Sequence, residues 1–219
     1  MKYAAPTTFI ALFCVLGCAT KQPKPDEAAD DGLVRVENVM LDELFVAPNV
    51  SLGHYRRVLL EPIEIEFQDG WRQKHPDMND REFEYFKTQL TDAFRETLVA
   101  ELARGGYALA EAPAQDILHL RVGVGDVDFA APETGVDKVT SVYVDGKMTL
   151  RVQGFDSPSG ALIARARDYE EDPESRHLKR ADRVRALHNA QMIFEKWAQE
   201  LRSALDVAKV SAGARTLQQ

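Results

Sequence analysis

The stretch NDREFEYFKTQLTDAFRETLVAELARGG, residues 79–106, decides how the chain folds. Asn79 is placed to cap a helix, with Glu82 completing a capping box, and Gly105-Gly106 is placed to end it. Between these signals the large apolar residues recur at helical spacing: Phe83, Phe86, Leu90, Phe94, Leu98 and Leu102. The spacing predicts a long amphipathic helix with one face buried against the rest of the domain.

The segment before this helix reads as extended structure. Residues 57–67 form the first predicted strand, which is apolar on both faces at Val58-Leu59-Leu60 and therefore central in a sheet. After Pro62 the strand alternates apolar and acidic residues, and Pro62 itself predicts a bulge or an unpaired position. Residues 33–52 carry short apolar bursts, and we expect an extended arm that docks on the core with room for one edge strand.

The segment after the helix predicts further strands and a second helix. Residues 107–109, 117–129, 139–156 and 161–169 read as strands, with a bulge near Gly123 or Gly125 in the second of them. Asp145-Gly146 is a hairpin signal, but the phase of the apolar residues favours a continuous or bulged strand through it. A second amphipathic helix is predicted from Val184 to near Lys209, and residues 211–219 are predicted to be a disordered tail.

These elements predict a single α+β domain over residues 33–210. We expect a two-layer sandwich, a mixed four- to five-stranded sheet with two amphipathic helices on one face, and a parallel pairing of the first and third strands. The other face of the sheet is predicted to be open and polar. Its residues are Glu64, Glu66, His119, Arg121, Arg151, Gln153, Arg165 and Arg167.

The N-terminus has the pattern of a secretory signal over residues 1–17: a basic start, then an apolar run too short to span a bilayer. Val15-Leu16-Gly17-Cys18 resembles a bacterial lipobox, which predicts cleavage before Cys18 and an N-acyl diacylglycerol lipid on its sulfur and amine. An ordinary cleaved signal with a chance cysteine is the alternative. By resemblance to Gram-negative lipoproteins, the non-acidic Ala19 implies sorting to the outer membrane.

The segment that follows, residues 18–32, predicts a lipidated cysteine and a disordered tether, because Ala19 to Gly32 is rich in proline and charge and has no large apolar residue. Removal of residues 1–17 takes away one positive charge, Lys2, so the net charge changes from −8 to −9. An acidic chain argues against nucleic acid as a partner. Cys18 is the only cysteine left after cleavage, so no internal disulfide is expected.

Several segments together resemble one bacterial lipoprotein family. They are LDELFVAP, YRRVLLEPIEIEF followed by GWR, FRETLVAELARGGYALAEAPAQDILHLRV, GKMTLRVQGFDSPSGALIAR and WAQELRSALD. The family is catalogued as a domain of unknown function, number 3313, and the resemblance covers roughly residues 33–209. It implies an envelope lipoprotein and supplies no activity. The order of elements is also similar to the N-terminal domain of TolB, a looser likeness of fold alone.

The sequence offers little catalytic chemistry. The five histidines have no metal-ligand spacing, Gly123-Val124-Gly125 opens no helix, and no G-x-S-x-G motif occurs. Asp126 and Asp128 place two carboxylates on one strand face, where they could bind a cation or serve a hydrolase, although a solvated strand end is the commoner meaning. We therefore expect no enzyme, no metal and no cofactor other than the lipid on Cys18.

Two candidate binding surfaces remain. The polar loop 68–78 carries Trp71, Arg72 and Lys74, which could stack on a sugar or hold an anionic group, and the favoured alternative is that Trp71 folds back under the first helix. Arg151, Arg165 and Arg167 on the open face could dock a partner, or could form a solvated ladder of cross-strand pairs. The basic run 176–185 could likewise meet lipid phosphates or pair with the acidic residues 170–174.

The sequence thus predicts an outer-membrane-anchored, periplasm-facing lipoprotein that acts as a non-catalytic binding or assembly module of the cell envelope. Its expected partners are the membrane, through the lipid anchor, and an envelope protein or polymer. The alternative is a binder of a small ligand, glycan or lipid head group through the Trp71 loop, and a hydrolase is the less favoured third.

The lipid anchor gives the first testable prediction. Cys18→Ser should abolish lipidation and leave the precursor uncleaved by the lipoprotein peptidase, because the thiol is the lipid acceptor. Incorporation of labelled palmitate, with Cys14→Ser as the matched control, measures this. Label still entering the Cys18→Ser protein would contradict the assignment.

Overall fold

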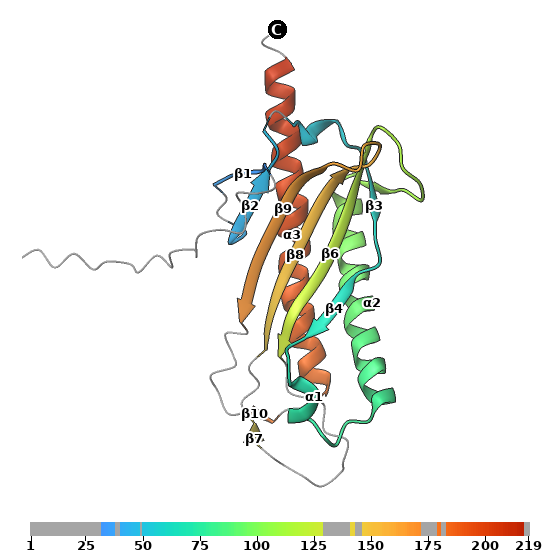
Figure 1. The fold of residues 1–219 in the computed structure, drawn as a ribbon, viewed down its shortest axis with the longest axis vertical. Helices are drawn as coiled ribbons and strands as arrows, with labels where there is room; N and C mark the ends of the chain where they lie inside the picture. Colours follow the sequence, from blue (N-terminus) through green and yellow to red (C-terminus); the bar gives the residue numbers. More distant parts are fainter. Residues whose placement is uncertain are drawn as a thin grey trace, which may run out of the picture.

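The computed structural model describes residues 32–37, 40–48, 50–128, 141–142, 146–171, 179–180 and 183–216. Within them a mixed sheet packs one face against two long helices, α2 and α3 (Figure 1). The α+β class and the placement of two amphipathic helices on one face are confirmed. The predicted signal, Cys18 and most of the predicted tether lie outside the described residues.

The main sheet has eight strands in the order β1-β2-β9-β8-β6-β3-β5, with β4 also pairing with β6. The prediction of four to five strands was too low, because the segment predicted as one strand over 57–67 forms two, and the arm also forms two. The strands are β1 Val34–Arg35, β2 Glu43–Val46, β3 Arg57–Leu60, β4 Glu64–Phe67, β5 Ala108–Leu109, β6 Ile117–Asp128, β8 Lys147–Asp156 and β9 Leu162–Glu171.

The parallel part of the sheet follows the prediction. β3 and β4 both run parallel to β6, and α2 connects the two sides of this pairing. Pro62 lies in the gap between β3 and β4, where a residue without an N–H takes no place in the ladder. The predicted arm is also confirmed: β2 pairs with β9 antiparallel, and β1 pairs with β2 at the edge.

The bulge predicted near Gly125 is present. The register of β6 shifts between residues 124 and 127 against β4 and between residues 125 and 128 against β8. Asp126 has a φ of 56°, the left-handed conformation in which asparagine and aspartate are the most frequent residues after glycine. The shift turns the end of β6, so that Val127 is buried while Asp126 is exposed.

Helix α2, Asp80–Arg104, begins and ends where the sequence predicts. The Asn79 side chain accepts a hydrogen bond from the Glu82 amide, and the Glu82 side chain accepts one from the Asn79 amide, both at 3.0 Å. Gly105 closes the helix, and Gly106, with a φ of 76°, turns the chain toward β5. The capping box is therefore confirmed residue by residue.

Three predicted boundaries were wrong. The strand predicted over 139–156 is not continuous: β7, Ser141–Val142, pairs with β10, Lys179–Arg180, in a separate small sheet, and β8 begins at Lys147. Residues 143–145 lie outside the described residues. Helix α3, Arg183–Thr216, runs past the predicted end at Lys209 and through most of the segment predicted to be a disordered tail. The loop predicted at Trp71 is a short helix, α1, Trp71–Lys74.

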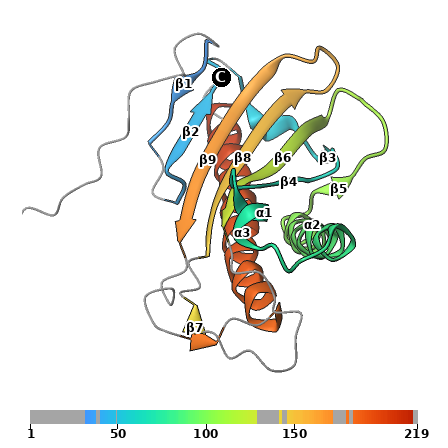
Figure 2. The same ribbon diagram turned by 60° about the horizontal axis from the view of Figure 1, so that its bottom comes forward.

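The core lies between the helices and the sheet (Figure 2). Phe94 of α2 stacks on Phe194 of α3, with ring centroids 4.6 Å apart, and Trp197 packs beside both. All three side chains are fully buried. The helical stripes read from the sequence therefore meet each other as well as the sheet.

The aromatic stack gives the second prediction. Phe94→Ala should lower the free energy of unfolding by about 3–5 kcal/mol, because it removes a fully buried ring and leaves a cavity. Met192→Ala on α3 is the control, since Met192 is 57% exposed and should change stability little. Chemical denaturation of both variants measures the difference, and equal midpoints for the two would contradict this account of the core.

Candidate functional site

Trp71 belongs to the core. It is 1% exposed and packs against Phe67, Phe83 and Phe86 beneath the start of α2. The favoured alternative, in which the indole folds back under the first helix, describes this position. A buried ring presents no face for a sugar to stack on, so the hypothesis of a glycan site at Trp71 loses its central contact.

The two cations beside Trp71 contact the protein itself. Arg72 donates to the Met78 carbonyl at 2.9 Å, pairs with Asp80 at 2.5 Å and lies over the Phe83 ring. Lys74 bonds the Gln68 side chain at 3.1 Å and reaches Asp128 at 3.5 Å. These contacts join α1 to the start of α2 and to the end of β6. Trp71, Arg72 and Lys74 therefore stabilise the packing of these elements.

The open face of the sheet carries a ladder of ion pairs. Arg121 holds Glu61 with two hydrogen bonds, at 2.8 and 3.1 Å, and His119 contacts the same carboxylate at 2.7 Å. The bonds from Arg121 are the main reason that the pKa of Glu61 lies below its usual value. Arg151 bridges Glu66 and Asp126, both at 3.1 Å. This half of the face fits the solvated-ladder alternative.

The other two predicted arginines lie nearer the arm. Arg165 is half-buried, and its guanidinium lies 5.0 Å from the centre of the Phe45 ring of β2. Arg167 is exposed, directly between Glu43 on β2 and Arg151 on β8 in the strand register. The structure therefore puts Arg151, Arg165 and Arg167 on one open face, while Trp71, Arg72 and Lys74 form a separate group.

The two carboxylates considered for a hydrolase each pair with a different basic side chain. Asp126 pairs with Arg151, and Asp128 pairs with Lys74. Among the described residues, no three His, Cys, Asp or Glu side chains are grouped in a way that could hold a metal ion.

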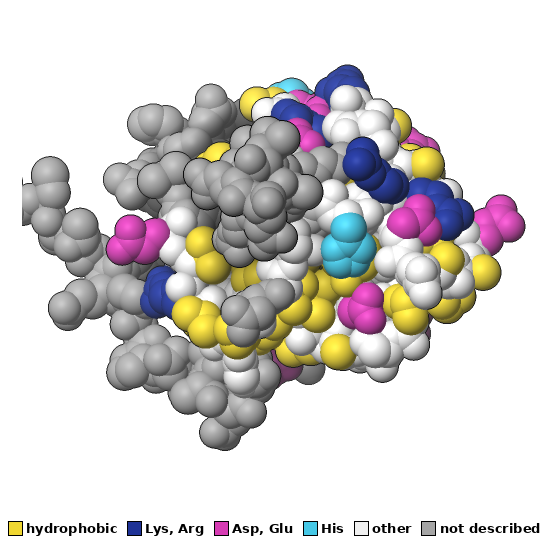
Figure 3. All heavy atoms as spheres, turned by 90° about the horizontal axis from the view of Figure 1, so that it is seen from above, with side chains coloured by type: hydrophobic (Ala, Val, Ile, Leu, Met, Phe, Trp, Pro, Cys, Tyr) yellow, Lys and Arg dark blue, Asp and Glu magenta, His cyan; other side chains and the backbone are white. Residues whose placement is uncertain are grey.

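A cavity lies where the arm, the sheet and the C-terminal half of α3 meet. Its volume is about 250 Å³, and hydrophobic side chains gather across this end of the molecule (Figure 3). We call it the arm–helix cavity. Its lining residues are Val36, Leu41, Leu44, Val46, Val50, Ser51, Leu52, Leu118, Leu120, Val152, Gly154, Ala164, Arg165, Ala166, Leu201, Ala204, Leu205 and Val207.

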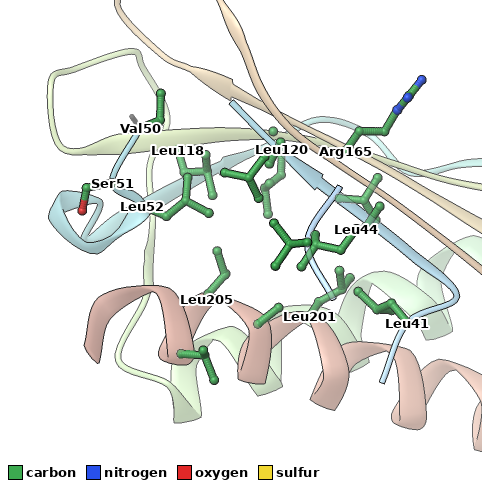
Figure 4. Close-up of a pocket in the computed structure, with 18 residues that line it drawn as sticks. Leu41, Leu44, Val50, Ser51, Leu52, Leu118, Leu120, Arg165, Leu201 and Leu205 are labelled. Carbon is green, nitrogen blue, oxygen red and sulfur yellow. The ribbon is translucent and has the colours of Figure 1, made fainter. Parts of the chain in front are cut away.

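The lining side chains come from elements far apart in the sequence. Figure 4 shows Leu44, Leu120 and Leu201 directed into one space from β2, β6 and α3. Gly154 of β8 lines the space without a side chain, and a methyl group there would make ordinary contacts with Leu118 and Ala164 at 3.5 Å. Arg165 contributes to the wall, but its side chain points away from the cavity (Figure 4). The inner surface is thus almost wholly aliphatic.

A buried carboxylate clamps the arm over this cavity. Asp168 of β9 is 3% exposed and accepts hydrogen bonds from the Trp197 indole at 2.8 Å and from the Asp42 amide at 2.9 Å. The Asp42 side chain in turn accepts from the Tyr169 amide at 3.1 Å. Asp42 lies beside Leu41, which lines the cavity, so the clamp fixes the arm at the cavity wall.

A second acidic group lies in the same place. Glu200 of α3 is 9% exposed, and one of its carboxylate oxygens has no hydrogen-bond partner. Burial raises the pKa of Glu200, while Lys196, at 3.5 Å, partly offsets this. Lys196 also pairs with Glu170 and lies 3.7 Å from Asp168. The side of α3 that faces the arm therefore carries a charged cluster, in which the buried Glu200 carboxylate lowers the stability of the fold.

Sequence reasoning missed the arm–helix cavity and the clamp. The aliphatic residues of the arm were visible, but they read only as a docking segment. One available signal was Asp168, a charged residue within a strand whose neighbours Ala164 and Ala166 face the core. The pairing of that residue with Trp197 and Asp42 spans 29 and 126 positions, so it exists only in the folded chain.

With this geometry described, the chain can be compared with known proteins. The family described as "Protein of unknown function (DUF3313)" matches residues 27–201. The chain belongs to this family. The resemblance inferred from the sequence is thus confirmed, whereas the looser likeness to the TolB domain stays a prediction. No curated protein matches the chain. In the described residues, no helix is long and apolar enough to cross a membrane.

Solved structures similar to this chain are distant. A PelC dodecamer from Paraburkholderia phytofirmans has 15% identity and a TM-score of 0.39, with 72% of this chain and 96% of that chain covered. A homologue of a neuraminyllactose-binding hemagglutinin from Helicobacter pylori has 15% identity, a TM-score of 0.40 and coverages of 75% and 92%. A minor lipoprotein from Acinetobacter baumannii has 12% identity, a TM-score of 0.37 and coverages of 70% and 94%.

Glu200 gives the third prediction. Because its pKa is raised in the fold, folding favours the protonated acid, and the resulting loss of stability develops as pH rises from the ordinary value of 4.5 through the raised one. Glu200→Gln should therefore raise the melting temperature at pH 7, by roughly 2–4 °C for each 1 kcal/mol recovered. The gain should shrink as the pH is lowered toward 4.5.

Glu195→Gln is the matched control, because Glu195 lies on the exposed side of the same helix. Thermal unfolding followed by circular dichroism at both pH values separates the two variants. An identical, pH-independent shift in both would contradict the assignment to Glu200.

Proposed function

We propose that this protein is a non-catalytic binding module of the bacterial cell envelope, anchored in the outer membrane by a lipid on Cys18 and facing the periplasm. In this proposal the arm–helix cavity is the binding site, and its guest is an aliphatic group. The observation that carries the proposal is the chemistry of the cavity wall.

The wall selects against polar guests. Apart from Ser51 and Arg165, every residue that lines the cavity is Val, Leu, Ala or Gly, and the Arg165 side chain points away. A polar group that enters such a space without a hydrogen-bond partner loses the free energy of its hydration. An alkyl group gains from the same transfer in proportion to the area removed from water.

The volume of the cavity limits the size of the guest. Pockets for drug-sized ligands run from roughly 300 to 1,000 Å³, and this one is about 250 Å³. A single alkyl chain, or part of one, suits the space better than a sterol or a whole lipid. The alternative of a glycan or head-group binder at Trp71 has less support, because that ring is buried.

The open face supports a second proposal, an envelope protein or polymer as a docking partner. Arg151 and Arg167 lie directly opposite each other on β8 and β9. Like charges opposite each other on a sheet are destabilising, and Arg167 is exposed. An acidic group on a partner would relieve this pairing. Because Arg151 already bridges two carboxylates, Arg167 offers the better contact.

The fourth prediction tests the cavity. Ala204→Phe should weaken the binding of a fluorescent fatty acid at least tenfold, because the ring fills the space that the alkyl chain would occupy. Binding is measured by the rise in emission on titration of residues 19–219, which contain every described residue, and by displacement with palmitate.

Ala103→Phe is the matched control, since Ala103 is an exposed position on α2 and the same substitution there leaves the cavity untouched. The control should bind like the unmodified chain. Binding equally strong in all three proteins would place the guest elsewhere, and no binding to the unmodified chain would overturn the proposed function.

A further inference from the structure

We propose that the guest of the arm–helix cavity is the chain's own lipid: one acyl chain on Cys18 lies in the cavity whenever the anchor is outside a bilayer. The inference rests on the proposed function, because it requires the cavity to accept an alkyl chain. It adds the source of that chain and a consequence, which is that the domain shields part of its own anchor from water.

The first support is where the described chain begins. Val34 of β1 is the register partner of Val46, and Val46 lines the cavity. Val36, two residues further along the arm, also lines it. The segment that leads back to Cys18 therefore leaves the fold one strand spacing from the cavity wall.

The second support is the reach of that segment. Residues 19–32, as a coil, span on the order of 20 Å. A group held at this distance has an effective concentration in the millimolar range around the cavity. A cavity with modest affinity for an alkyl chain is then filled by its own anchor before it meets a free fatty acid at lower concentration.

The third support is the exposed apolar surface beside the cavity. Val36 is 42% exposed and Val207 is 66% exposed, although both contribute to the lining. Val36 belongs to the arm and Val207 belongs to α3. An alkyl chain that enters between them covers both, so that the methylene groups too long for the cavity also remain in contact with apolar side chains.

The two positions of the acyl chain have different energetics. In the bilayer the chain is already in an apolar medium, so the cavity offers no large advantage and remains open to another guest. In water the cavity removes part of the acyl chain from solvent, so the position in the cavity has the lower free energy. Contact with a membrane therefore empties the site, and extraction from the membrane fills it.

The test uses the mature chain, Cys18–Gln219, in which Cys18 is the only thiol. The sulfur is alkylated with a hexadecyl group that carries a diazirine at its far end, and the protein is irradiated in buffer. The crosslink should fall on peptides of the arm, β6 or α3 that line the cavity, within one molecule and to the same extent over a tenfold dilution. Ala204→Phe should reduce it at least tenfold, Ala103→Phe should not, and added phospholipid vesicles should suppress it.

Each other result overturns the inference. Crosslinks that survive in Ala204→Phe, or that join two protein molecules, would show that the tethered chain lies elsewhere. Free fatty acid binding in the cavity of the thiol-blocked chain, without a crosslink from the tethered chain, would sink the self-anchoring idea and leave the proposed function standing. Absence of both signals would remove the two together.

Discussion

The architecture of this domain depends on one buried carboxylate. Asp168 lies in β9, the strand that pairs directly with the arm, and it accepts hydrogen bonds from the Trp197 indole of α3 and the backbone amide of Asp42 in the arm. A carboxylate this deeply buried is tolerated only because these donors and nearby Lys196 compensate for its lost hydration. The arm, β9 and α3 are thereby fixed to one another at a single residue. The arm–helix cavity is the space that this three-way junction leaves between them.

The rest of the core makes that junction possible. α2 and α3 are held together by the stack of Phe94 on Phe194, and Arg202 of α3 binds the buried Glu101 of α2 at 3.2 Å. These contacts fix α3 against α2, and the C-terminal end of α3 extends beyond the shorter α2. The part of α3 that lines the cavity, residues 201–207, lies next to the C-terminal end of α2, where Arg202 contacts Glu101.

Local signals in the sequence explain what was predictable. The capping box at Asn79, the stripe along α2 and the break at Pro62 each depend on neighbours within a few positions, and each was found in the structure. The strand β1 has two residues and carries no such pattern, whereas the equally short β5 lies within the predicted strand 107–109. The burial of Trp71 and the apolar walls of the cavity depend on residues brought together from distant segments. The composition of the arm shows that it is apolar. Only the register of β2 against β9 shows that the arm forms a wall of the arm–helix cavity.

The two faces of the sheet differ in how far their side chains are already paired. On the open face, Arg121 and Arg151 are neutralised by Glu61, Glu66 and Asp126, so most of its charge is already satisfied and gives orientation to a partner more than affinity. On the helix face, the lining of the cavity is aliphatic apart from Ser51 and Arg165, so an alkyl group that enters it gains free energy by leaving water. The clamp at Asp168 links the two, because its strand carries Arg165 and Arg167 outward and Ala164 and Ala166 inward. A guest that moves the arm therefore also moves the edge of the open face, since Phe45 of the arm packs beneath Arg165. In the proposed function, this strand pair would couple binding in the cavity to docking on the sheet.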